Sequence, residues 1–368
     1  MTNETLVATT KRDARSRATA MRVSVRRAAV APRAAALSRS ATSPRARRAA
    51  TVAPRASADP IMIVSDLDGT MVGDDAATAA FTAAWTEEGA FPPGSTLVYS
   101  TGRSLESFAA LIAEKRAVMA VPDALICAVG TKVYKRVEPE PEQSPVESAL
   151  RRLMTLASMK PTRPTDDIER ELRCWIEDPD WTARLDADWD VDVVRAAATS
   201  AIAEAGDANA HFRPEEECAE HKITLGVRDE HVETVTASIE RHCAENEKVV
   251  VPKLIVSGTG GWQYVDVVSR GAGKLESLEY VRAAFGVAKK RTVACGDSGN
   301  DIAMLGGENK AIVVGNAQPA LVRWAREAAE TETERSRDRL FVACESEALG
   351  VLEGLRRFGM MVEKGSDD

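Results

Sequence analysis

Ile61-Met62-Ile63-Val64-Ser65-Asp66-Leu67-Asp68-Gly69-Thr70 is the stretch that decides the fold of this chain. A short apolar run that ends in acids and a glycine is typical of a buried parallel strand running into a loop. Residues two apart in extended chain point the same way, so the carboxylates of Asp66 and Asp68 face one site. Because close carboxylates repel each other, they need a shared proton or a cation, and Mg²⁺ prefers oxygen ligands. Taken alone, Asp-x-Asp is more often an Asx turn or a helix cap.

Strand and helix patterns alternate after this stretch and again near the end of the chain. This alternation predicts an α/β fold with a doubly wound parallel sheet. The predicted strands are residues 61–65, 96–100, 124–128, 291–295 and 311–314, and the predicted helices are residues 76–89, 104–116, 275–285, one from about 300, and 318–329.

The middle of the chain breaks the alternation and predicts an inserted α+β cap. Neighbouring strands are predicted at 223–227, 254–257 and 264–268, with helices at 146–158, 191–205 and 230–245. Three tryptophans in the segment 174–190 either stack on a sugar or, more often for Trp, belong to a core. The predicted division is residues 59–145 and 263–358 for the core domain, 146–262 for the cap, and 1–58 and 359–368 for flexible tails.

Charge is distributed unevenly along the 368 residues, whose formal net charge is −8. Residues 1–58 hold 13 Lys and Arg against two acids, whereas the remainder holds 35 against 54. An acidic body argues against nucleic-acid binding, and no apolar run approaches the roughly 18–20 residues that span a bilayer. The Arg- and Ser-rich tail is typical of a transit peptide, which predicts a chloroplast protein. A mitochondrial address, or a basic tail without an address in the cytoplasm, is the alternative.

Three further motifs also follow predicted strands or open a helix. Ser100-Thr101-Gly102-Arg103 offers a hydroxyl and backbone N–H groups to phosphoryl oxygens, although a helix N-cap explains it equally well. Gly271-Ala272-Gly273-Lys274 opens a helix, where the lysine either holds an anion or is simply solvated. In residues 296–301, two Asp four apart at a turn can converge on one cation. Ligands bind at the carboxyl ends of strands in such a sheet, so the motifs are expected to meet.

Together the motifs predict Mg²⁺-dependent phosphoryl transfer through an aspartyl-phosphate. In this scheme Asp66 attacks phosphorus, and Asp68 acts first as general acid and then as general base. The other groups neutralise the phosphoryl oxygens. The predicted metal ligands are Asp66, Asp68, Asp297 and Asp301, and the predicted phosphate-holding residues are Thr101 and Lys274.

These motifs, in this order and spacing, resemble the haloacid dehalogenase superfamily of Mg²⁺-dependent phosphatases. More narrowly, the chain is similar to sucrose-phosphate phosphatases over roughly residues 60–358. The residues that carry this similarity are 61–72, 98–104, 128–131, 271–274, 296–301 and 315–318.

The resemblance implies roles for individual residues. Asp68 would also bind Mg²⁺ through its backbone carbonyl, and Asp301 would bind it directly or through water. His221 and Lys222, before a cap strand, match a His-Lys pair that helps to hold the sugar. The predicted substrate-binding residues are Thr101, Gly102, Arg103, His221, Lys222 and Asn300.

The expected reaction is the hydrolysis of sucrose 6-phosphate by a monomer. The expected partners are the small-molecule sugar phosphate and the upstream sugar-phosphate synthase, without nucleic acid or membrane. Phosphatases of glucosylglycerol phosphate or mannosylglycerate phosphate, and a phosphosugar mutase, remain open. A non-catalytic sensor is disfavoured because Asp66 and Asp68 are both present. A receiver domain would need neither the insertion nor Asp68 as acid and base.

Overall fold

The structure is a computed structural model that describes residues 59–137 and 164–362, except Glu247, Val249, Thr259 and residues 332–337. The tail 1–58, the predicted helix 146–158 and most of the tail 359–368 therefore lie outside the described residues. None of the described helices is long and apolar enough to cross a membrane.

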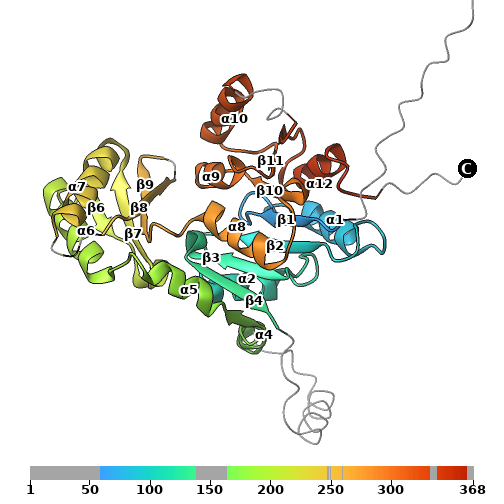
Figure 1. Ribbon diagram of the computed structural model, residues 1–368, viewed down its shortest axis with the longest axis horizontal. Coiled ribbons are helices and arrows are strands. Elements are labelled where there is room, and N and C mark those ends of the chain that lie inside the picture. Colours follow the sequence, from blue (N-terminus) through green and yellow to red (C-terminus); the bar gives the residue numbers. More distant parts are fainter. Residues whose placement is uncertain are drawn as a thin grey trace, which may run out of the picture. The chain divides into compact units, whose positions relative to one another are not determined.

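An eight-stranded sheet forms the larger layer, in the order β12-β11-β10-β1-β2-β3-β4-β5 (Figure 1). Its strands are parallel from β12 to β3, as predicted, whereas β4 and β5 form an antiparallel edge that was not predicted. The strands are β1 Met62–Ser65, β2 Thr96–Ser100, β3 Ala124–Cys127, β4 Lys132–Arg136, β5 Trp175–Glu177, β10 Thr292–Gly296, β11 Lys310–Val313 and β12 Leu340–Val342.

Helices cover both faces of this sheet, which confirms the doubly wound α/β fold. Successive residues of β1 point to opposite faces: Ile63 joins the apolar core under one helical layer, and Met62 and Val64 join the other. Each fully buried large side chain, such as Phe81 of α1, contributes roughly 1.5–3 kcal/mol. One layer contains α1 Asp75–Thr86, α2 Leu105–Lys115 and α12 Glu347–Arg357, with α4 Pro164–Leu172 packed on α2; the other contains α5 Pro179–Asp186, α8 Lys274–Ala284, α9 Ile302–Leu305 and α10 Pro319–Thr331.

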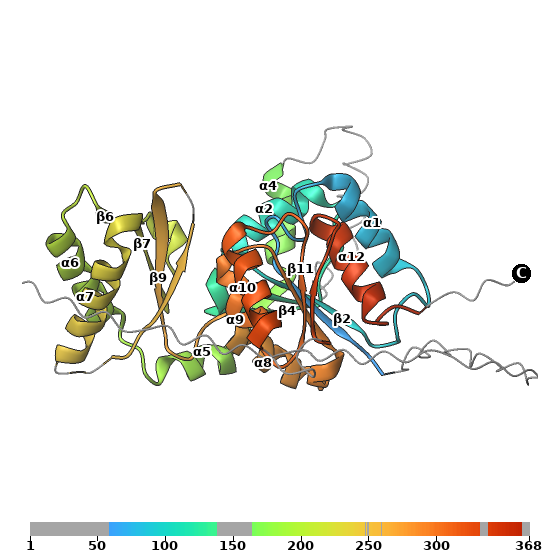
Figure 2. The same ribbon diagram turned by 90° about the horizontal axis from the view of Figure 1, so that it is seen from above.

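A four-stranded antiparallel sheet in the order β6-β7-β9-β8 forms the inserted module. Helices α6 and α7 cover one of its faces (Figure 2). Alternate residues of β7 point into that core, among them Ile223 and Leu225, whereas Lys222 and Thr224 lie on the uncovered face. Its elements are β6 Ala210–Phe212, β7 Lys222–Arg228, β8 Lys253–Ser257, β9 Trp262–Val268, α6 Val191–Ala205 and α7 Val232–Glu245. We call residues 191–268 the cap.

The strand order of the two sheets differs from the predicted boundaries of the cap, residues 146–262, and of the second core segment, residues 263–358. β9 belongs to the cap sheet, so the chain returns to the larger sheet after Val268 rather than after residue 262. β5 pairs with β4, and Trp181 of α5 packs in the core of the larger sheet, so this segment precedes the cap. Trp175 is also part of that larger core, whereas Trp189 packs against the cap's core, so none of the three stands free to stack on a sugar.

Candidate active site

The predicted motifs meet at the carboxyl ends of three adjacent parallel strands. Asp66 follows β1, Thr101 follows β2, and Asp297 follows β10. The backbone N–H of Asp66 donates to the carbonyl of Cys295 within β10 at 3.0 Å, which extends the pairing of β1 and β10 to the first residue of the loop. Because β1 lies between β2 and β10 in the sheet, residues more than 190 positions apart come together at one edge.

Lys274 stands at the centre of the site, at the first position of α8. Its side chain is buried, and the residue is only 2% exposed. The ammonium donates to Asp66 Oδ1 at 2.6 Å, to Asp301 Oδ1 at 2.7 Å and to Asn300 Oδ1 at 3.2 Å. A buried lysine is tolerated only with such partners, so this ammonium serves the carboxylates and is not a solvated surface group.

Three buried carboxylates surround this one ammonium. Oxygens of Asp66, Asp297 and Asp301 lie within 4.8 Å of one another. Burial, and then the neighbouring carboxylates, raise the pKa of Asp66 to about 8, although Lys274 opposes the rise. Burial and Asp301 likewise raise the pKa of Asp297 to about 6. The cluster therefore has an excess of negative charge and an all-oxygen donor set, which fits a hard divalent cation such as Mg²⁺.

Asp301 has both carboxylate oxygens engaged. Its Oδ2 accepts the backbone N–H groups of Asp297 at 3.2 Å and of Ser298 at 3.1 Å, while its Oδ1 accepts from Lys274. These bonds hold the loop after β10 in the shape that presents Asp297 to the site.

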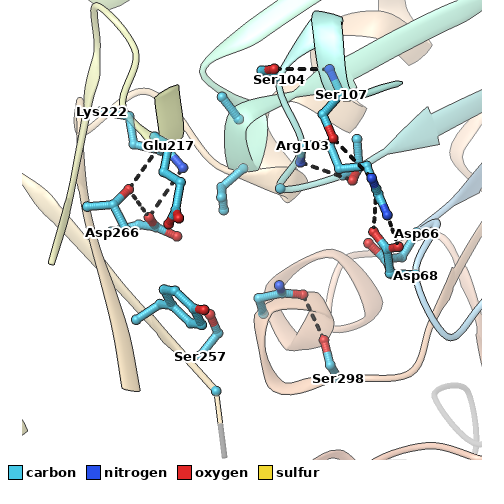
Figure 3. A pocket seen from close by; sticks show the side chains of 18 of the residues that line it. Asp66, Asp68, Arg103, Ser104, Ser107, Glu217, Lys222, Ser257, Asp266 and Ser298 are labelled. Carbon is cyan, nitrogen blue, oxygen red and sulfur yellow. Dashed lines mark hydrogen bonds and ion pairs between the residues drawn. The ribbon is translucent and has the colours of Figure 1, made fainter. Parts of the chain in front are cut away.

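Asp68 stands apart from the carboxylate cluster. Arg103 holds it from the side, with Nε donating to Oδ2 at 2.8 Å and an Nη donating to Oδ1 at 2.5 Å. Arg103 also donates to Ser107 Oγ at 3.0 Å. The predicted substrate-binding arginine thus lies at the site but binds the predicted acid and base (Figure 3). The Asp68 carboxylate is not part of the cluster of Asp66, Asp297 and Asp301.

A pocket of about 680 Å³ opens over these groups. In Figure 3, Asp66, Asp68 and Arg103 lie on one side of it, opposite Glu217, Lys222 and Asp266 of the cap. The predicted residues that line it are Asp66, Asp68, Thr101, Gly102, Arg103, Lys222, Asp297 and Asn300. The hydroxyl of Thr101 accepts the backbone N–H of Arg103 at 3.1 Å, which orients the loop toward the pocket.

The cap contributes a polar face to the pocket. Lys222 lies 3.4 Å from Asp266 Oδ1, and the hydroxyl of Thr224 donates to the same oxygen at 2.7 Å. Tyr264 is 42% exposed there, and Arg213 stacks over its ring at 5.2 Å. This face combines hydrogen-bonding groups with one aromatic ring, which suits a polyhydroxylated ligand.

His221 departs from the prediction, because it is not among the described residues that line the pocket. It is fully buried, and its Nε2 lies 2.7 Å from Asp186 Oδ1 at the end of α5. His221 directly precedes β7, and adjacent side chains of extended backbone point to opposite sides, so His221 does not share the pocket-facing side of Lys222. His221 instead joins the cap to α5.

Sequence reasoning missed several residues that line the pocket. For Thr224, Tyr264 and Asp266 the signal was present in β7 and β9, where these residues alternate with Ile, Leu and Val. The missed residues include Ser107, Glu217, Thr224, Ser257, Tyr264, Asp266 and Gln318.

Comparison with known proteins gives one family. The model described as "Sucrose-6F-phosphate phosphohydrolase" matches residues 59–153 and 169–359. "Sucrose-phosphatase 1" of Nicotiana tabacum is 28% identical over 312 residues, which cover 83% of this chain and 60% of that protein. The chain therefore spans about 60% of the length of the curated plant relative.

Two further similarities cover nearly the whole of the other protein. "Mannosylfructose-phosphate phosphatase" of Agrobacterium fabrum (strain C58) is 26% identical over 302 residues, covering 81% of this chain and 97% of that one. The solved sucrose-phosphatase of Synechocystis sp. PCC6803, in complex with sucrose and phosphate, superposes with a TM-score of 0.59. It is 22% identical and covers 82% of this chain and 99% of that one, which supports the fold.

Proposed function

The chain belongs to the sucrose-6F-phosphate phosphohydrolase family, and on that premise we propose that it hydrolyses a sugar phosphate, with sucrose 6-phosphate as its substrate. The observation that carries the proposal is the buried cluster of Asp66, Lys274 and Asp297 beneath a pocket whose far side is polar. Such a site binds a phosphoryl group at its base and leaves room for a sugar against the cap.

In the first step, a carboxylate oxygen of Asp66 attacks phosphorus, and the bond from phosphorus to the sugar oxygen breaks. Asp68 donates a proton to that leaving oxygen, so the sugar departs as a neutral alcohol. Lys274, the Thr101 hydroxyl and the backbone N–H of Gly102 stabilise the phosphoryl oxygens, where negative charge must be offset. The product on the protein is an acyl phosphate on Asp66.

In the second step, Asp68, now a carboxylate, takes a proton from water. The water oxygen attacks phosphorus, the bond to Asp66 breaks, and inorganic phosphate leaves. Arg103 holds both oxygens of Asp68, which keeps this carboxylate in one orientation beside the pocket. A mutase would instead return the phosphoryl group to a sugar.

Mg²⁺ fits the oxygen donors of this site. The residues that would hold it are Asp66 and Asp297 through carboxylates, Asp68 through its backbone carbonyl, and Asp301 directly or through water. When bound, it supplies positive charge that offsets the carboxylates and the phosphoryl group.

Recognition of the sugar falls to the cap. Lys222, Thr224 and Asp266 offer donors and acceptors to sugar hydroxyls, and Tyr264 offers a ring face. Residues of the core domain bind the phosphoryl group, which all sugar phosphates share. The residues on the cap face therefore distinguish one sugar phosphate from another.

The test is phosphate release with Mg²⁺ from a panel of substrates by the protein lacking residues 1–58. The panel contains sucrose 6-phosphate, mannosylfructose phosphate, glucosylglycerol phosphate, mannosylglycerate phosphate and glucose 6-phosphate. Asp66→Asn is the control for contaminating phosphatases. A clear preference in kcat/KM for sucrose 6-phosphate supports the proposal, a preference for another member reassigns the sugar, and transfer between sugar positions without phosphate release indicates a mutase.

We propose that the basic segment 1–58 directs the protein to the chloroplast. Its 13 Lys and Arg against two acids contrast with the acidic remainder of the chain. A fluorescent fusion of residues 1–58 should accumulate in plastids, whereas uptake by mitochondria or a cytosolic signal would contradict the address.

A further inference from the structure

The turn formed by residues 315–318, at the carboxyl end of β11, contacts two loops of the site. The side-chain amide of Asn316 donates to the backbone carbonyl of Gly69 at 2.7 Å. Next in the same turn, the backbone N–H of Gln318 donates to the carbonyl of Asp297 at 2.7 Å. The sequence marks this motif, but the proposed reaction assigns it no role. It nevertheless donates to a backbone carbonyl in each of the two loops that carry Asp66 and Asp297.

Glu347, the first residue of α12, completes this connection. Its backbone N–H donates to Asn316 Oδ1 at 2.8 Å, and its carboxylate accepts the backbone N–H of Asp74. Asn316 and Glu347 therefore hold the loop of residues 66–74 at two points, Gly69 and Asp74. The NH₂ and the oxygen of the Asn316 side-chain amide both make hydrogen bonds. The NH₂ must face a carbonyl and the oxygen must face an N–H, so these two bonds fix the orientation of the amide.

Glu347 adopts an unfavourable backbone conformation to make these contacts. Its φ is +51°, in the left-handed region that residues other than glycine rarely occupy. Such conformations persist where surrounding contacts determine them, and they cluster at functional sites. The contacts of Asn316 and Glu347 are exposed to solvent, so stabilising a core does not explain them.

Gly69 explains why the loop needs support from outside. It follows Asp68 directly, with φ at +81°, and a Cβ there would lie 2.7 Å from Asp297 Oδ2. A side chain at this position would be strained and would displace the Asp297 carboxylate, and the contact that Gly69 makes with Asn316 uses its backbone carbonyl. Asn316 provides an anchor next to Asp68, whose carboxylate is 55% exposed and is held from the other side by Arg103.

We propose that Asn316 and Glu347 are positioning residues for Asp68 in the reaction, an inference that rests on the proposed phosphatase function. They fix the backbone of the loop so that the carboxyl of Asp68 reaches the leaving oxygen of the sugar. Displacing a catalytic group by about 1 Å can cost 100-fold in rate, so small movements of this loop matter.

The leaving group separates this role from a merely structural one. A sugar alkoxide needs a proton to depart, so its release depends on a correctly placed general acid. The p-nitrophenolate ion leaves without a proton at neutral pH, so p-nitrophenyl phosphate depends much less on Asp68 in the first step. A misplaced Asp68 therefore lowers kcat/KM, which reports the first step, more for the sugar phosphate than for the aryl phosphate, whereas general damage to the site lowers it for both.

The experiment measures kcat and KM of the Mg²⁺-loaded protein for both substrates, the sugar phosphate being the best one of the panel. Asn316→Asp keeps the acceptor for Glu347 N–H but loses the donor to Gly69. We expect its kcat/KM, which reports the first step alone, to fall about 10- to 100-fold for the sugar phosphate and about threefold or less for p-nitrophenyl phosphate. Glu347→Ala should show the same pattern, and Glu347→Gln, which keeps an acceptor for Asp74 N–H, should restore activity.

Asn209→Asp is the matched control. Asn209 also donates from its amide to a backbone carbonyl, that of Ala205 at 2.8 Å, but it lies in the cap away from the pocket. Its kcat should stay within about twofold of the wild type. Equal losses on both substrates in Asn316→Asp and Glu347→Ala, or no loss in either, would overturn the positioning role. A wild-type protein inactive on both substrates would refute the proposed function itself.

Discussion

Removing the ammonium of Lys274 tests the charge balance of the site directly. Lys274→Met keeps a side chain of similar length but takes away the ammonium that contacts both Asp66 and Asp301. Three buried carboxylates then remain without a cation in a sample that contains EDTA. The variant should lose both stability and phosphatase activity, because the same ammonium also faces the phosphoryl group in the proposed reaction.

The size of the stability loss follows from the burial of the contacts. Breaking a buried ion pair by removing one partner costs about 3–5 kcal/mol, since an uncompensated charge stays buried. Asp66 can relieve part of this cost by protonation, because its pKa is already raised to about 8. We therefore expect about 3 kcal/mol, the lower end of that range, at neutral pH. At about 2–4 °C for each kcal/mol, the Tm should fall by roughly 6–12 °C.

Differential scanning calorimetry in EDTA measures this shift, with Lys253→Met as the matched control. Lys253 pairs with Glu276 at 2.6 Å, but the two side chains are 31% and 35% exposed. Such a pair contributes at most about 1 kcal/mol, so the control should lose about 4 °C or less. Adding Asp66→Asn to Lys274→Met should restore part of the Tm, because it removes one of the excess charges. A Lys274→Met protein that melts like the wild type would refute this account of the cluster.

Further predictions concern the remaining groups of the site. Asp66→Asn should abolish phosphate release, and in EDTA its Tm should match or exceed that of the wild type; residual turnover would remove Asp66 as nucleophile. Asp297→Asn should raise the half-saturating Mg²⁺ concentration at least about tenfold, and an unchanged Mg²⁺ titration would contradict its role as a ligand. In EDTA, the Tm should fall as the pH rises from about 4 to about 8. The folded protein retains protons on Asp66 and Asp297 in this range, because their pKa values are raised from 3.8 to about 8 and about 6. With Mg²⁺ bound, this dependence of the Tm on pH should become flatter. A Tm that instead rises over this interval would reverse the sign of these shifts. Lys222→Ala should raise KM for the sugar phosphate about tenfold or more but leave KM for p-nitrophenyl phosphate unchanged, and equal effects on both would place Lys222 outside the sugar pocket.

The parts of the fold with strong local patterns were predicted correctly. β1, β2 and β3 are short apolar runs ending in turn-forming residues, and the helices between them carry apolar faces and caps such as Ser104 before α2. β4 and α12 were missed. β4 has the sequence Lys-Val-Tyr-Lys-Arg, and three basic residues among five also suit a surface loop. Local pattern does not decide between these states, because pairing with β3 is what stabilises the strand.

The cap was predicted less well than the core for a related reason. Its existence follows from the change in pattern, but β6 has three residues, and the chain changes sheet at points without a marked sequence signal. Lys222 and His221 were predicted together because they match a His-Lys pair of the family that the chain resembles. The extended backbone sends them to opposite sides, and burial against Asp186 takes His221 out of the pocket.

The sequence by itself determined the chemical groups of the site and the strand ends that carry them. It could do so because an apolar run followed by Asp, Gly and Thr is a local pattern, and local sterics and burial translate it directly into a strand and a loop. Only the tertiary structure decided which groups compensate one another. Lys274 meets Asp66 across 208 positions of the chain, and Asn316 meets Gly69 across 247. Such contacts arise when the sheet brings distant strand ends to one edge, where desolvation makes each buried charge depend on its neighbours.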